Sequence, residues 1–150
     1  AGEREPGSAT EQAGFAAWLL SSPGWETEAL RQFERLIEAE ADLSHLPPNA
    51  LYNASCAAAR ASTAAEPVEA RRLRTKALQW LATDFRIRRA AVARARAQQP
   101  PPDHLEAMSV QLGQAVEHAM TKDPDLAPLR ELPGFREICA EESEPPPADR

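Results

Sequence analysis

Apolar residues recur every three or four positions along most of the chain, a spacing that places them on one face of an α-helix. The repeat predicts a first helix from about Thr10 to Leu20, a second from about Pro23 to Ala41 and a third from Asn49 to about Ser62. Thr10 and Ser22 are residue types that cap helix N-termini, so we expect them to cap the first two helices. No stretch of alternating apolar and polar residues indicates a β-strand.

Prolines separate the predicted helices from one another. A fourth helix is expected from near Pro67 to about Ala97, and prolines 100–102 end it. Asp103 followed by Glu106 is typical of an N-terminal capping box, which predicts that a fifth helix begins at this pair. Short helical segments beyond Lys122 form a C-terminal cap. The prediction is an all-α fold in which five to six helices form an antiparallel stack of helical hairpins.

The fourth predicted helix carries two adjacent apolar faces, so it needs helical neighbours on two sides. Asp84 falls inside one of these apolar stripes. A buried carboxylate costs several kcal/mol unless it is paired, which predicts that Asp84 is a buried structural residue held by an ion pair or a hydrogen bond. A functional acid, or a kinked helix that exposes Asp84, are the alternatives.

The chain has 150 residues, the size of one domain. We expect the helical domain to cover residues 10–142, with polar tails at residues 1–9 and 143–150. No apolar run approaches the ~20 residues of a membrane span, and the N-terminal segment shows no signal peptide. Cys56 and Cys139 lie far apart in sequence and are interpreted as free thiols in a reducing compartment, which favours the cytoplasm.

Positive charge is concentrated on the fourth predicted helix, whereas the whole chain has a net charge of −6. The basic face of this helix comprises Arg71, Arg72, Lys76, Arg86, Arg89 and Arg94. Such a face could bind nucleic acid or another acidic ligand through phosphates or carboxylates. It lacks the interleaved aromatic residues that stack on bases, and nucleic-acid binders are typically basic overall. Pairing with acidic residues of neighbouring helices is therefore the favoured interpretation, ahead of an acidic protein partner and of nucleic acid.

Two segments resemble tetratricopeptide repeats, which are helical hairpins of protein-interaction arrays. Residues 25–33 resemble the second helix of a repeat, and residues 51–58 resemble the first helix of the next. Ser55 stands where the motif requires a small residue at the helix crossing, and Ala77 resembles the closing alanine of the second helix. Residues 77–85 and the run from Lys122 to Arg130 resemble the C-terminal, capping end of such arrays in large bacterial serine/threonine kinases and related signalling proteins.

The resemblance implies a partner-binding groove on the concave side of the first and third predicted helices, formed by Tyr52, Asn53, Cys56 and Arg60. An asparagine at the position of Asn53 can hold the backbone of an extended peptide, although local packing is an equal alternative. Arg60 lies on the same helix face as Asn53 and could bind a carboxylate. Cys56 is interpreted as a small core residue rather than a reactive thiol, because its surroundings are apolar.

Catalytic chemistry has no support in the residue pattern. The three histidines, His45, His104 and His118, show no metal-ligand spacing with one another or with the cysteines, and the phosphate-binding and catalytic motifs of kinases are missing. We therefore expect no enzyme activity, no metal and no cofactor. The predicted function is a non-catalytic protein–protein interaction or scaffolding module in bacterial signalling, with a protein or peptide as partner. The alternative is a binder of nucleic acid or an acidic ligand through helix 67–97.

The tryptophans are expected to belong to the core rather than to a ligand site. Trp18 and Trp25 flank a Pro-Gly turn, which predicts that they join the first two helices. If the first helix leaves an apolar face without a neighbour, self-association of the chain is an additional expectation.

Overall fold

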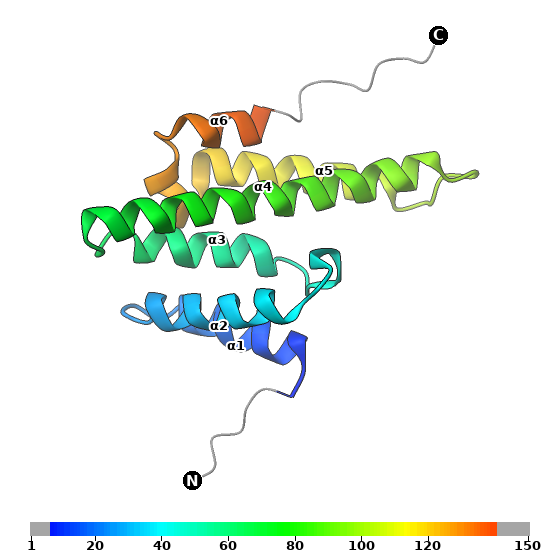
Figure 1. The fold of residues 1–150 in the computed structure, drawn as a ribbon. Helices are drawn as coiled ribbons and strands as arrows, with labels where there is room; N and C mark the ends of the chain where they lie inside the picture. Colours follow the sequence, from blue (N-terminus) through cyan, green and yellow to red (C-terminus); the bar gives the residue numbers. More distant parts are fainter. Residues whose placement is uncertain (1–6, 141–150) are drawn as a thin grey trace.

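The computed structural model describes residues 7–140 and contains no strand among them, which confirms the all-α prediction (Figure 1). The first hairpin consists of α1 (Ala9–Leu20) and α2 (Glu26–Ala39). A 3₁₀ turn, η1 (Leu43–His45), then leads to α3 (Ala50–Ala61).

The C-terminal half is built around one long helix, α4 (Pro67–Ala97). It is followed by α5 (Leu105–Glu117), which continues into a π-helical turn, η2 (His118–Lys122). A 3₁₀ helix, η3 (Pro124–Leu129), and the short α6 (Pro133–Ala140) complete the described chain. None of the described helices combines the length and the apolar character that a membrane span requires.

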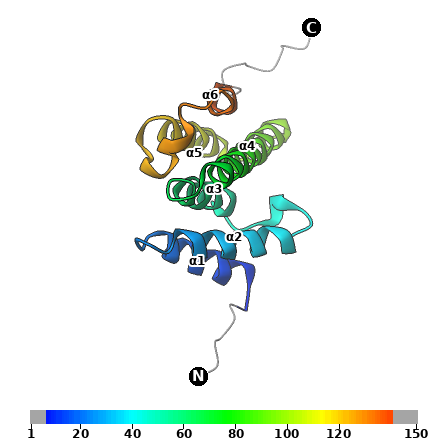
Figure 2. The same cartoon turned by 60° about the vertical axis from the view of Figure 1, so that its left-hand side comes forward.

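The helices form a stack in chain order. Contacts join α1 to α2, α2 to α3, α3 to α4 and α4 to α5, while η3 packs back against α3 and α6 packs on α4. As a result α1 and α6 lie at opposite ends of the molecule, as both views show (Figures 1 and 2). The two apolar faces predicted for α4 are accounted for, because α3 and α5 are both its neighbours.

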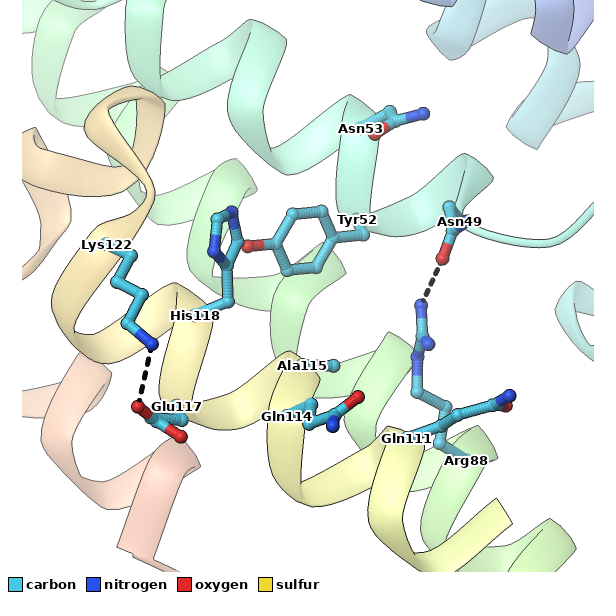
Figure 3. Close-up of a pocket in the computed structure, with 10 residues that line it drawn as sticks. All are labelled: Asn49, Tyr52, Asn53, Arg88, Gln111, Gln114, Ala115, Glu117, His118 and Lys122. Carbon is cyan, nitrogen blue, oxygen red and sulfur yellow. Dashed lines mark hydrogen bonds and ion pairs between the residues drawn. The ribbon is translucent and has the colours of Figure 1, made fainter. Parts of the chain in front are cut away.

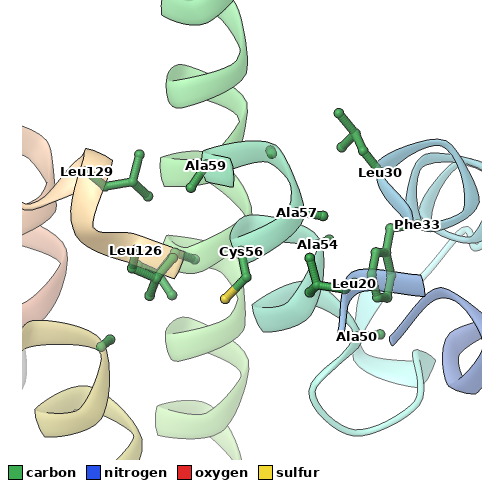
Figure 4. Packing of buried hydrophobic residues seen from close by; sticks show 14 of the residues in the cluster. Leu20, Leu30, Phe33, Ala50, Ala54, Cys56, Ala57, Ala59, Leu126 and Leu129 are labelled. Carbon is green, nitrogen blue, oxygen red and sulfur yellow. The ribbon is translucent and has the colours of Figure 1, made fainter. Parts of the chain in front are cut away.

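Helix α3 forms the centre of the core because its side chains are small. Ala54 and Ala57 are fully buried on the side of α2, where Leu30 and Phe33 contact this face, and Cys56 points to the other side, toward Leu126 (Figure 4). Small residues let helix axes approach closely, so the neighbours pack on the α3 backbone itself.

A hydroxyl marks the crossing of α3 and α4. Ser55 is fully buried, and its Oγ donates a hydrogen bond of 2.8 Å to the carbonyl oxygen of Ala77. This bond satisfies the Ser55 hydroxyl in an alanine-rich contact, so its burial carries no unpaired-group penalty.

Three predicted helix starts were wrong. Ser8, not Thr10, caps α1 by accepting the backbone N–H of Glu11 at 3.2 Å, so regular structure begins inside the segment predicted as a tail. Trp25 and His104 occupy the positions before α2 and α5, and neither helix has a side-chain cap. Gly24, at φ 85, redirects the chain before α2 in place of a Ser22 cap.

The exposed tryptophans correct a second prediction. Trp18 and Trp25 are 62% and 53% exposed, and Trp18 stacks on Phe15 with ring centroids 6.0 Å apart on the outer surface of α1. They do not join α1 to α2; Phe33 and Leu19, which are buried, contribute to that contact instead. Trp18 is exposed because no described helix packs on the outer side of α1.

Asp84 is buried and paired. Its Oδ2 accepts a hydrogen bond of 2.6 Å from Nε of Arg88, one turn further along α4, and Arg88 Nη2 donates to the Asn49 side chain at 2.8 Å. Burial raises the pKa of Asp84, and the Arg88 guanidinium acts in the opposite direction. The pair therefore fixes the start of α3 against the middle of α4.

Candidate functional site

A groove of about 680 Å³ runs between the start of α3 and the α5–η2 segment (Figure 3). This volume lies within the range of ligand-binding clefts, about 300–1,000 Å³. The groove is lined by Asn49, Tyr52, Asn53, Arg88, Gln111, Gln114, Ala115, Glu117, His118 and Lys122.

Carboxamide side chains line both walls of the groove. Asn49 and Asn53 are one turn apart on α3, while Gln111 and Gln114 are one turn apart on α5. Each carboxamide offers a hydrogen-bond donor and an acceptor, the same two groups that a peptide bond presents. Asn49 is held by Arg88, and both glutamines are exposed to solvent. The walls can therefore match the main chain of a bound segment.

One end of the groove is closed by a tyrosine bonded to a buried carboxylate. Tyr52 Oη donates a hydrogen bond of 2.8 Å to Oδ2 of Asp123, and Nε2 of His118 lies 3.6 Å from the same oxygen. Burial, reinforced by the Asp123 carboxylate, raises the pKa of Tyr52 well above its ordinary value. Tyr52 is therefore a neutral hydrogen-bond donor with a fixed orientation at physiological pH.

Asp123 connects α3 with the C-terminal segments. Its Oδ1 accepts the backbone N–H of Asp125 at 2.9 Å and so caps η3, while its Oδ2 lies 3.7 Å from the thiol sulfur of Cys56. Its main-chain carbonyl accepts a hydrogen bond from Arg130. The sequence predicts that Asp123 and Pro124 open a helical turn through Leu129, which η3 confirms, but it does not indicate the contact of Asp123 with α3.

Two of the four predicted groove residues lie elsewhere. Tyr52 and Asn53 line the groove, but Cys56 is only 3% exposed and faces η3. Arg60 donates to the carbonyl of Leu20 at 2.6 Å and to Glu26 at 2.5 Å, and its Nη1 lies 3.7 Å from Asp125. Arg60 of α3 thus links α1, α2 and η3. Its carboxylate partners belong to this chain and not to a bound peptide, because a helical wheel does not show which neighbours pack against a helix face.

The predicted basic face is divided between engaged and exposed side chains. Lys76 pairs with Glu34 of α2 at 2.5 Å and lies over the Trp80 ring, and Arg89 donates to the carbonyl of Ile138 at 2.9 Å. Arg72 pairs with Glu69 of its own helix at 2.9 Å. The remaining members, Arg71, Arg86 and Arg94, are exposed. Pairing with a neighbouring helix, as expected from charge balance, is shown for Lys76.

Stability is expected to fall above pH about 8.5, and Cys56 should carry a measurable part of the loss. Burial, and next the Asp123 carboxylate, raise the pKa of the Cys56 thiol. The neutral thiol is favoured in the folded state, whereas the unfolded thiol ionises from pH about 8.5 upward. Its contribution is therefore complete below that pH and declines as pH rises, by up to about 1.4 kcal/mol per pH unit. Urea denaturation midpoints between pH 7 and 10 should decline less steeply for Cys56→Ser; equal slopes would contradict this.

No protein-family model matches this chain, and neither a curated protein nor a solved structure is significantly similar to it. The resemblance to tetratricopeptide repeats therefore rests on the sequence segments alone. The functional interpretation of the groove rests on its own residues and geometry.

Proposed function

We propose that this chain is a non-catalytic protein–protein interaction module that binds an extended segment of a partner protein in the groove between α3 and α5. The observation that carries the proposal is that carboxamides line the groove from both sides, Asn49 and Asn53 from the start of α3 and Gln111 and Gln114 from α5. Carboxamides recognise a peptide main chain irrespective of its sequence, and a groove open to solvent admits an extended segment.

The fold is consistent with a divergent tetratricopeptide arrangement, which we propose for α1 to α4, with α5 and α6 as a capping end. Ser55 and Ala77, the two residues that resemble the motif, meet at the α3–α4 crossing through the 2.8 Å hydrogen bond. A role as the terminal, scaffolding unit of a bacterial signalling protein follows from that resemblance and is part of the proposal.

A non-catalytic role is supported by the state of the chain's best candidate nucleophile. Cys56 lies near Asp123, which His118 also approaches, but the cysteine sulfur is buried beside a carboxylate, and burial raises the pKa of the thiol. Nucleophilic cysteines need the opposite, an electropositive and partly exposed position. Cys56 is a buried thiol outside any disulfide, which fits the reducing cytoplasm that we propose as the location.

The alternative, a basic face on α4 that binds nucleic acid or an acidic ligand, has weaker support. Lys76, Arg72 and Arg89 already interact with other groups of the protein, so half of the predicted face is engaged. The face also contributes no part of the groove, where Arg88 is the only α4 residue among those lining it.

Peptides selected from a random display library for binding to the folded protein should lose affinity when carboxamide side chains of the groove walls are replaced by alanine. Asn53→Ala combined with Gln114→Ala removes one carboxamide from each wall, and two lost hydrogen bonds of about 1 kcal/mol each correspond to a loss of about tenfold or more. Dissociation constants measured by fluorescence anisotropy check this. The matched control is Gln79→Ala, an exposed glutamine on α4 that does not line the groove.

Two outcomes would reject the groove as the binding surface. One is that every selected peptide binds the double variant as tightly as the original protein. The other is that Gln79→Ala weakens binding as much as the double variant does. If selected binders instead lose affinity when Arg71, Arg86 and Arg94 are changed to Glu, the basic face of α4 is the partner surface.

A further inference from the structure

Three side chains of types that bind metals converge where η3 meets α3. Ligand atoms of Cys56, Asp123 and Asp125 all lie within 4.8 Å of one another. His118, the first residue of the π-helical turn, lies beside this group, with its Nε2 3.6 Å from Asp123 Oδ2. Cys56 belongs to α3, whereas the other donors lie within residues 118–125, so the approach of the thiol to them is a property of the fold and not of a local motif.

Two of the donor–donor distances, both measured from Asp123 Oδ2, are close to the edges of a zinc tetrahedron. Zinc bonds of about 2.3 Å to sulfur and about 2.0–2.1 Å to nitrogen or oxygen give ligand–ligand edges of about 3.3–3.5 Å. The Cys56 Sγ–Asp123 Oδ2 distance is 3.7 Å and the His118 Nε2–Asp123 Oδ2 distance is 3.6 Å. A shift of a few tenths of an ångström would bring both edges to zinc geometry. We propose that Cys56, His118, Asp123 and Asp125 form a Zn²⁺ site.

The charge of the cluster favours a divalent cation. With the thiol ionised, Cys56, Asp123 and Asp125 carry three negative charges, and Arg60, 3.7 Å from Asp125, is the nearby cation. Zn²⁺ would offset two of these charges, while Arg60 is shared between Asp125 and Glu26. Binding replaces the thiol proton by the metal: the S–H bond breaks, the S–Zn bond forms, and the proton leaves to solvent. The thiolate, imidazole and carboxylate donors are the set that zinc prefers.

The surroundings supply both support and access. Tyr52 donates to Asp123 at 2.8 Å and orients the carboxylate, as outer-shell partners of metal ligands do. The His118 side chain is 53% exposed, so an ion can enter from the groove side, while Cys56 and Asp123 close the site from within. The site adjoins one end of the groove, where Tyr52 and His118 line it, but the proposal does not depend on peptide binding and is tested without any peptide.

Metal titration of the untagged, chelator-treated protein tests the site. Calorimetry should show one equivalent of Zn²⁺ bound, and Co²⁺ used as a spectroscopic probe should produce thiolate-to-metal charge-transfer absorption. Cys56→Ser should abolish that absorption. Loss of an outer-shell partner weakens metal binding by about 10–100-fold, so Cys56→Ser and His118→Ala should each weaken it at least tenfold. His118→Ala changes an exposed residue and keeps the test independent of folding.

Matched controls are Cys139→Ser and His104→Ala, which change the same residue types outside the cluster. Both should leave the stoichiometry and the cobalt absorption unchanged, with folding checked by circular dichroism. Absence of stoichiometric Zn²⁺ binding by the original protein would overturn the proposal. So would cobalt absorption that persists in Cys56→Ser, or Zn²⁺ affinity that neither Cys56→Ser nor His118→Ala reduces.

Discussion

Replacing Phe33 with alanine is expected to lower the free energy of unfolding by about 3–5 kcal/mol, the range measured for truncating buried aromatic residues. Phe33 is fully buried on α2, and its ring faces Ala54 and Ala57 of α3 (Figure 4). Alanine side chains have no atoms with which to fill the space that the ring leaves. The cavity would remain open, so we expect the upper half of that range.

The comparison variant is Trp18→Ala, which removes a larger aromatic ring. Because Trp18 is 62% exposed, the loss should stay within about 0.5 kcal/mol. Urea denaturation followed by circular dichroism gives both values, and equal denaturant slopes would show that the denatured state is unchanged. A larger loss for Trp18→Ala than for Phe33→Ala would mean that the tryptophan contributes to the core, as the sequence alone suggested.

Replacing Arg60 with alanine is expected to destabilise the fold by about 2–3 kcal/mol while leaving the groove intact. Hydrogen bonds to charged groups contribute about 1.5–3 kcal/mol, and partial exposure of the Arg60 side chain, at 25%, reduces the sum of its contacts. The variant removes the hydrogen-bond donors to the Leu20 carbonyl and the Glu26 carboxylate, and it removes the cation beside Asp125. The contact between the α1–α2 hairpin and α3 should weaken most.

Arg72→Ala is the control for this variant. Arg72 pairs with Glu69 on the surface of α4, and exposed pairs of this kind contribute about 0–1 kcal/mol. Peptides selected on the groove should bind Arg60→Ala with unchanged affinity at a temperature where the variant is folded. Lost binding without lost stability would show that Arg60 contacts the partner directly.

Helix type and position were largely predictable, because both depend on neighbouring residues. The apolar spacing of α4 indicated an interior helix, and Asp84 inside an apolar stripe indicated a buried pair. Both features follow from which residues share a helix face. The identity of the partner, Arg88, and its onward bond to Asn49 depend on how α3 approaches α4.

Helix starts and aromatic burial were less predictable. Ser8, Thr10 and Ser22 are all competent caps, and the difference between them is smaller than the effect of packing on where a helix begins. Trp18 is hydrophobic by residue type, but its burial requires a neighbour on the outer side of α1. Local sequence does not specify whether such a neighbour is present.

The candidate site was predicted in part. Tyr52 and Asn53 were identified from one helix, whereas the opposite wall, Gln111 and Gln114, was missed because two exposed glutamines carry no distinguishing signal. Spacing along the chain does not show that His118 and Cys56 both approach Asp123, since those contacts depend on the π-helical turn and on η3 packing against α3.

The sequence by itself determined that the chain is all-helical, that α4 is an interior helix and that Asp84 is buried, because periodicity and capping chemistry act over a few residues. Only the tertiary structure decided that Arg60 links α1, α2 and η3, that Trp18 faces solvent and that Tyr52, His118 and Asp123 meet. Those outcomes depend on contacts between residues separated by up to 71 positions, as in the bond from Tyr52 to Asp123. The order of residues along a helix face does not contain that information, since it is set by how whole helices pack on one another.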